Sequence, residues 1–155
     1  MRILAIDPGP EQSAYVLWDT QEHNFISYCF KKMGLVSNKE LRCLLDDVYL
    51  PVDLIAIEVP QSYGRVIGRS MFETCIEVGR FIQAAFHKAD KIKLYGRPTI
   101  KGQIGGRTDA EIRASLRIRY GEARKGEKLE GVVRDIWSAL ALAVALEENP
   151  KLKEW

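Results

Sequence analysis

A chain of 155 residues with 46% apolar and 28% charged side chains has the composition of one ordinary globular domain, and its formal net charge is only +2. This composition excludes a disordered or fibrous protein, and no stretch is apolar for long enough to predict a secretory signal or a membrane span. We therefore expect a single cytoplasmic domain over residues 1–155 that has no association with a membrane.

The first part of the chain predicts strands joined by short turns. Three apolar, β-prone runs lie at 2–7, 13–19 and 25–30. The turn formers Pro8-Gly9-Pro10 separate the first two runs, and the polar residues 21–24 separate the second from the third. Consecutive strands with such short connections are typical of an antiparallel meander.

The rest of the chain predicts alternating helices and strands. Ser37 and Asn38 can cap a first helix. The expected elements are, in order, a helix over 39–48, a strand over 53–58, a helix over 68–88, a strand over 91–95, a helix over 108–120 and a helix over 132–148. The last helix is apolar on all sides from Ile136 to Leu146, which is typical of a buried helix. We expect an α/β fold with a mixed five-stranded sheet and helices on both faces.

The three cysteines, Cys29, Cys43 and Cys75, form an odd set at wide spacing. This spacing matches neither a disulfide framework nor a metal-binding Cys-x-x-Cys pair. We interpret them as buried, reduced thiols without a chemical role.

Three carboxylates stand at the edges of strongly apolar elements: Asp7, Glu58 and Asp135. Buried carboxylates that lie near one another repel and raise one another's pKa, so a cation or a basic side chain must compensate them. Mg²⁺ prefers oxygen ligands, and two such ions can activate water and stabilise the leaving oxygen in phosphodiester cleavage. Each residue also has a structural alternative, as a turn residue, a strand-end charge or a helix N-terminal charge respectively.

The combination of these carboxylates with their neighbours resembles the RuvC-type Holliday junction resolvases over nearly the whole chain. The matching stretches are Ile6-Asp7-Pro8-Gly9, Ile57-Glu58, Glu77-Val78-Gly79-Arg80, Arg97-Pro-Thr-Ile-Lys101 with Gly105-Gly106-Arg107, and Asp135-Ile-Trp-Ser-Ala-Leu-Ala-Leu-Ala. The resemblance implies an RNase H-like fold, a homodimer, and symmetric nicking of the opposed strands of a four-way DNA junction at a four-acid Mg²⁺ or Mn²⁺ site.

By this resemblance, Asp7, Glu58 and Asp135 are catalytic metal ligands, with two ions in the site, and Lys101 lies near the scissile phosphate. The position of the fourth acid carries Ser138. A spacing of three places Asp135 and Ser138 on one helical face, so the hydroxyl could hold a metal-bound water without supplying a charge.

Basic residues gather in 97–128, where nine Lys and Arg against four Asp and Glu give +5, leaving −3 for the rest of the chain. Such a segment is either a solvated helix face or a surface that contacts phosphates. We expect Arg97, Lys101, Arg107 and Arg113 to contact DNA, together with Arg65 and with Tyr63, which could stack on an unpaired base.

Three alternatives to a DNA junction nuclease remain at this point. Ser138 could make the protein a catalytically weak binder of branched nucleic acid, and a nuclease of the same fold could process RNA. An ATP-handling use of the fold is disfavoured, because such enzymes need a second domain to close on the nucleotide.

Overall fold

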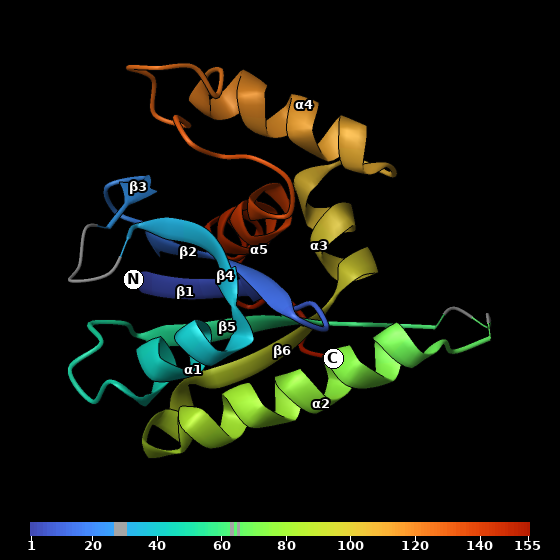
Figure 1. Ribbon diagram of the computed structural model, residues 1–155. Coiled ribbons are helices and arrows are strands. Elements are labelled where there is room, and N and C mark those ends of the chain that lie inside the picture. Colours follow the sequence, from blue (N-terminus) through green and yellow to red (C-terminus); the bar gives the residue numbers. More distant parts are fainter. Residues whose placement is uncertain (27–30, 63, 65) are drawn as a thin grey trace.

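The computed structural model describes residues 1–26, 31–62, 64 and 66–155, and these form a mixed sheet between two layers of helices (Figure 1). The strands are β1 (Arg2–Asp7), β2 (Gln12–Asp19), β3 (Asn24–Phe25), β4 (Met33–Ser37), β5 (Leu54–Val59) and β6 (Ile92–Gly96). The helices are α1 (Asn38–Asp46), α2 (Arg69–Ala84), α3 (Arg97–Ile104), α4 (Asp109–Tyr120) and α5 (Ile136–Glu148), with a 3₁₀ segment at Phe86–Lys91. This is the expected α/β fold class.

The sheet order is β3-β2-β1-β5-β6, and β4 also pairs with β2. Strands β1 and β2 are antiparallel, while β5 runs parallel to both β1 and β6. The third strand was expected over 25–30, but β3 ends at Phe25 and residues 27–30 lie outside the described part of the chain. Strand β4 was not expected, and it raises the described strands from five to six.

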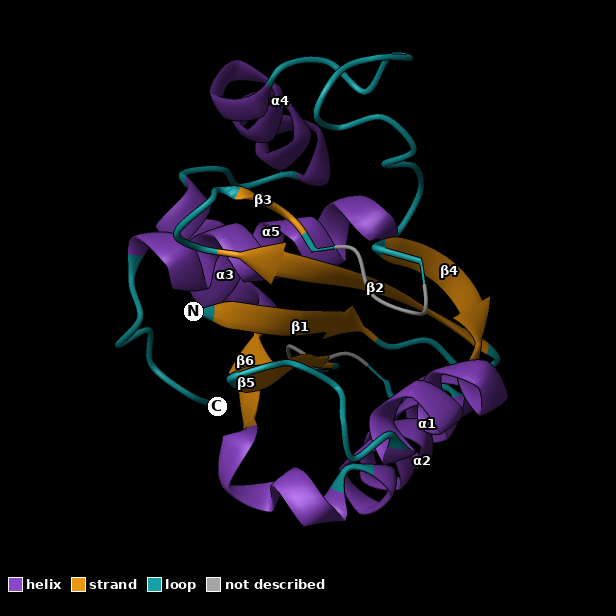
Figure 2. Ribbon diagram, turned by 90° about the vertical axis from the view of Figure 1, so that its left-hand side faces the viewer, coloured by secondary structure: helices purple, strands orange, loops and turns teal. Residues whose placement is uncertain are grey.

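Alternating side chains of the sheet enter two separate cores. Ile3 and Ala5 of β1 belong to the core that contains α5, whereas Leu4 and Ile6 pack with residues of α1 and α2. The side chains of α5 are buried from Ile136 to Leu146 except for Ser138, because the sheet covers one side of this helix and α3 and α4 cover others (Figure 2). Helices therefore cover both faces, as predicted.

The helix ends follow the local sequence. Ser37 and Thr108 both form complete capping boxes, with Glu40 and Glu111. Helix α3 was not predicted, although it has a start and a stop signal: Pro98 lies in its first turn, and Gly105 ends it with a left-handed φ of 87°. Helix α2 ends at Ala84 rather than at residue 88, and α5 begins at Ile136 rather than at residue 132.

The interpretation of the cysteines as buried was wrong where it can be checked. Cys43 and Cys75 are exposed, because α1 and α2 turn these positions away from the sheet, and Cys29 lies outside the described residues. Trp18 and Trp137 are core residues. Among the described residues, no helix combines the length and apolarity that a membrane crossing requires.

Candidate active site

The candidate site lies where the parallel strands end. Asp7 is the last residue of β1, Glu58 is the penultimate residue of β5, and Arg97 follows β6 directly as the first residue of α3. Because parallel strands end at the same edge of a sheet, these three side chains reach one region. Asp135 and Ser138, at the start of α5, complete the group from the helical layer above.

A hydrogen-bonded turn fixes the chain directly after Asp7. The Gly9 amide donates to Ser13 Oγ at 3.2 Å, and Ser13 Oγ donates to Asn38 Oδ1 at 2.7 Å. Asn38 Nδ2 in turn donates to the carbonyl oxygen of Gly9 at 3.0 Å. Only glycine fits at position 9, since a Cβ atom there would lie 2.4 Å from the carbonyl oxygen of Gln12. The turn formed by Pro8-Gly9-Pro10 therefore holds Asp7 in place.

The carboxylate of Asp7 lacks full compensation. Burial raises its pKa to about 7, and repulsion from Glu58 and Asp135 acts in the same direction. The charge of Arg97 and a hydrogen bond from Ser138 oppose this increase without cancelling it. Asp7 is thus repelled by both of the other predicted acidic residues, and its charge is only partly compensated.

Asp135 occupies the N-cap position of α5 but makes no capping hydrogen bond with its side chain. The exposed carboxylate is therefore not used to satisfy the helix end. Arg134, just before it, has a positive φ of 47°, a strained conformation for a residue with a side chain. A strained backbone conformation persists only where the surrounding structure maintains it, and such residues are often found at functional sites.

Glu58 is compensated by Arg97, unlike Asp7. The Arg97 Nη1 atom lies 2.7 Å from Glu58 Oε1, and the Glu58 side chain is only 9% exposed. Burial raises the pKa of Glu58, and the adjacent guanidinium group of Arg97 limits this increase. The Nη2 atom of Arg97 also donates to Asp109 Oδ1 at 2.9 Å and to Ser138 Oγ at 3.4 Å.

Lys101 and Asp109 form the outer part of the site. Lys101 Nζ lies 2.8 Å from Asp109 Oδ1 and donates to the carbonyl oxygen of Arg107 at 3.3 Å. The hydrogen bond from Lys101, aided by Arg97, lowers the pKa of Asp109, so this carboxylate is ionised at neutral pH. Sequence reasoning assigned Asp109 only to a helix start, and its neighbours in the site come from other elements.

These side chains line one cleft between β5, α3, α4 and α5. Its polar lining consists of Glu58, Arg97, Lys101, Asp109, Arg113 and Ser138. Its apolar lining consists of Ile100, Ile112, Trp137 and Ala141. The cleft thus joins the predicted catalytic lysine to the predicted ligands Glu58 and Ser138.

Asp7 and Asp135 supply oxygen atoms of the kind that a divalent ion accepts, whereas Glu58 is already paired with Arg97. Among the described residues, no three His, Cys, Asp or Glu side chains come close enough together to hold a metal ion. Asp7 is repelled by Asp135, and the Ser138 hydroxyl acts to lower its pKa, so all three groups near this position present oxygen atoms, which Mg²⁺ accepts together with water. Glu58, by contrast, is already engaged by Arg97.

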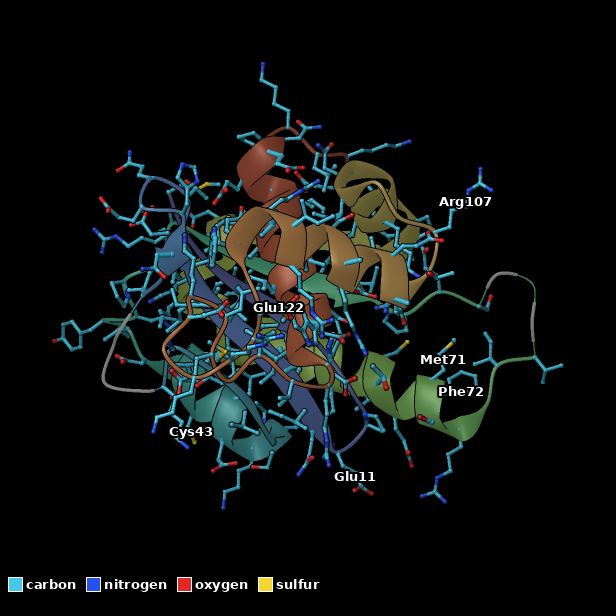
Figure 3. The ribbon with its side chains drawn as sticks, turned by 90° about the horizontal axis from the view of Figure 1, so that it is seen from above. Glu11, Cys43, Met71, Phe72, Arg107 and Glu122 are labelled. Atoms are coloured by element: carbon cyan, nitrogen blue, oxygen red, sulfur yellow. The ribbon has the colours of Figure 1, made fainter. Side chains whose placement is uncertain are left out.

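The predicted DNA-binding residues are placed unequally. Arg97 and Lys101 are held inside the cleft, and the exposed Arg113 lines it. Arg107 lies at the periphery, on the same side of the molecule as Met71 and Phe72 of α2 (Figure 3). Tyr63 and Arg65 lie outside the described residues.

Several other cations of the basic segment have structural partners. Arg117 stacks over the Trp137 ring at 5.4 Å, and Arg119 pairs with Glu148. Lys128 lies 5.1 Å from the centre of the Tyr120 ring. These three side chains tie α4 and the following loop to α5 and the core, so they are poor candidates for a phosphate-binding surface.

The strand order, the covering helices and the acidic edge define the class of fold as RNase H-like α/β. More particularly, the chain has the fold of RuvC. It superposes on RuvC from Thermus thermophilus in complex with a Holliday junction substrate with a TM-score of 0.72, 15% sequence identity, and coverage of 100% of this chain and 99% of that chain. A second Thermus thermophilus RuvC structure gives a TM-score of 0.65 at 16% identity, with 100% of both chains covered. No family model and no curated protein matches the sequence.

Proposed function

We propose that this protein is a divalent-metal-dependent endonuclease that nicks four-way DNA junctions as a homodimer. The observation that carries the proposal is Asp7, whose half-buried carboxylate at the end of β1 is repelled by both Glu58 and Asp135. The shared fold supports it, because one of the similar RuvC structures contains a Holliday junction substrate. Neither the sequence identity nor the fold alone carries this function to the present chain.

The roles of the side chains follow from their positions. Asp7 and Asp135 would hold Mg²⁺ or Mn²⁺, and the Ser138 hydroxyl would orient a water molecule. A divalent ion bound there supplies an activated water and stabilisation of the developing charge. Lys101 would contact the phosphate, while Arg107 and Arg113 would neutralise flanking phosphates without reading bases. The version with two ions requires Glu58 to exchange Arg97 for metal.

The exposed face of α2 supports the homodimer. Phe72 and Ile76 are 59% and 54% exposed, and an added Cβ at Gly79 would meet open space. Successive apolar positions on one helical face, followed by glycine, allow a second helix to approach closely. Replacing Phe72 by Glu should therefore give a monomer in analytical ultracentrifugation, whereas a wild-type monomer would contradict the homodimer.

The test is a nicking assay on a synthetic four-way junction with Mg²⁺ or Mn²⁺. Asp7→Asn should lower the nicking rate at least about 100-fold, since loss of one charge-stabilising group costs that much in comparable sites. Asp46→Asn, which changes an exposed residue at the end of α1, is the matched control and should cut like wild type. Equal cutting by wild type and Asp7→Asn would remove Asp7 from the mechanism.

The substrate is tested in the same assay. Linear duplex DNA and an RNA-containing junction serve as competing substrates, and the proposal expects the DNA junction to be cut fastest. Preferential cutting of the RNA-containing substrate would instead identify an RNA-processing nuclease of the same fold.

A second candidate function is binding of branched DNA without cleavage. Two observations favour it: a neutral hydroxyl at Ser138, and the ion pair between Arg97 and Glu58. Tight junction binding combined with no cleavage in Mg²⁺ or Mn²⁺ would select this candidate.

A further inference from the structure

Arg97 is built into the site rather than lying on its surface. Its guanidinium group contacts Glu58 at 2.7 Å, Asp109 at 2.9 Å and Ser138 at 3.4 Å. These partners come from β5, α4 and α5, so three different elements hold the planar guanidinium group of Arg97 in place. The side chain is 30% exposed, much less than a solvated arginine on a helix face such as Arg69, at 92%.

The backbone before Arg97 is equally constrained. Gly96 is buried at the end of β6, and a Cβ atom there would lie 2.8 Å from Gln61 Nε2. Pro98 follows in the first turn of α3 and restricts φ. The backbone of Arg97 is thus defined by the end of β6 before it and by the first turn of α3 after it.

The charge balance of the site gives Arg97 a specific role. Asp7, Glu58 and Asp135 together carry three negative charges when ionised. Arg97 neutralises one of them, and one divalent ion neutralises the remaining two. If a second divalent ion bound while Arg97 kept its position, the three carboxylates, Arg97 and the two ions would together carry a net charge of +2. The Glu58 carboxylate would also still be paired with Arg97 and less able to bind that ion.

Ser138 agrees with this balance. Its hydroxyl accepts a hydrogen bond from Arg97 at 3.4 Å and also acts to lower the pKa of Asp7, so it lies close to both the arginine and the incompletely compensated carboxylate. Because the hydroxyl is neutral, it adds no negative charge that a further cation would have to offset.

We infer that Arg97 is a permanent counter-charge that takes the place of a second divalent ion, so that each chain binds one ion, beside Asp7 and Asp135. This inference rests on the proposed function and deepens it. Arg97 acts here as a positioning residue, because it holds Glu58 and Ser138 and sets the number of ions.

The test is isothermal titration of the full chain with Mn²⁺ alone, which measures stoichiometry independently of cutting. Wild type should bind one ion per chain. Arg97→Ala and Arg97→Gln both remove the positive charge at this position, so each variant should bind a second ion. The glutamine amide can still donate a hydrogen bond to Glu58, so Arg97→Gln tests the charge separately from the hydrogen bond. Arg113→Ala, which removes another arginine from the same cleft, should still bind one ion.

Two ions in wild type would overturn the inference, and this result can be read even if the variants do not fold. A single ion of unchanged affinity in both folded Arg97 variants would also overturn it. A nicking assay run in parallel distinguishes the role of Arg97 from the proposed function. If wild type binds two ions and cuts the junction, only the role inferred for Arg97 is wrong. No bound ion and no cutting by wild type removes both that role and the proposed function.

Discussion

A buried carboxylate and a half-buried carboxylate in this molecule have opposite surroundings. Glu77 of α2 is 8% exposed and lies 2.5 Å from both Arg42 of α1 and Arg80 of its own helix. Asp7, at the end of β1, has two acidic neighbours and only partial compensation from Arg97. The first arrangement joins two helices, whereas the second leaves electrostatic repulsion in the folded state.

The contrast separates structural from functional burial of charge. A carboxylate with complete ion pairs stabilises the contact it spans, and nothing further needs to bind there. A buried carboxylate with residual repulsion lowers the stability of the fold, which is tolerated where an external cation restores the balance. The two sites should therefore respond in opposite directions when their charge is removed.

The largest expected effect is a loss of stability when Glu77 is neutralised. Glu77→Gln removes the anion shared by Arg42 and Arg80, and it should lower the free energy of unfolding by about 2 to 3 kcal/mol, the range for charged hydrogen bonds. Urea unfolding monitored by circular dichroism measures this change. An unchanged or increased stability would end the distinction between the two carboxylates.

Neutralising Asp7 should have the opposite sign. Its pKa is raised to about 7 from an ordinary value of 3.8, so the folded state binds a proton more tightly than the unfolded state does. The stability of metal-free wild type should therefore fall as the pH rises from about 4 to about 7. At pH 8, Asp7→Asn should be more stable than wild type by about 1 to 2 kcal/mol, less than the shift alone would give, because Asp7 is partly exposed.

Thermal unfolding at pH 3 and pH 8 tests this second prediction. The advantage of Asp7→Asn should be absent at pH 3, where the wild-type carboxyl is protonated in both states. Asp46→Asn should show no advantage at either pH. A less stable Asp7→Asn at pH 8 would mean that the carboxylate is fully satisfied in the fold.

A divalent ion should act on the region of Asp7 alone. Mg²⁺ at five times its dissociation constant should stabilise wild type by about 1 kcal/mol at pH 8. The melting temperature of Asp7→Asn should not respond to Mg²⁺, while that of Glu77→Gln should increase as in wild type. Equal responses of all three proteins would indicate binding of Mg²⁺ elsewhere.

The smallest expected effect concerns the cations of the two regions. Arg107→Ala should weaken junction binding about 3-fold and reduce the slope of log K against log salt by about 0.9, the value for one phosphate contact. Arg80→Ala should leave the binding affinity and the salt slope unchanged, because Arg80 forms an ion pair with Glu77 and is not expected to contact DNA. Fluorescence anisotropy over a salt series measures both, and equal effects would place DNA on α2 as well.

Much of the fold could be predicted from local patterns. The helix starts at Ser37 and Thr108 depend on residues three positions apart, and the burial of α5 follows from its continuous apolar sequence. Strand β4 escaped prediction because it is short and includes Gly34, and α3 escaped because it contains proline and glycine. The exposure of Cys43 and Cys75 depends on which helical face meets the sheet.

The site was predictable only in part. Asp7 and Glu58 were found because a carboxylate at the end of an apolar strand is conspicuous. The ion pair between Glu58 and Arg97 joins residues 39 positions apart, so no local sequence pattern predicts it. The part played by Asp109 was hidden for the same reason, because an acidic residue in the first turn of a helix is explained by the local sequence alone.

The turn after Asp7 also links distant parts of the molecule mechanically. Asn38, the first residue of α1, is hydrogen-bonded to the carbonyl oxygen of Gly9 in this turn. Arg42 of the same helix forms an ion pair with Glu77 on α2. A displacement of α2 can therefore reach the backbone beside Asp7 through the Glu77–Arg42 ion pair, the first turn of α1 and the Asn38 side chain. In the proposed homodimer, pairing through α2 would by this route affect the sheet edge that carries Asp7 in each copy.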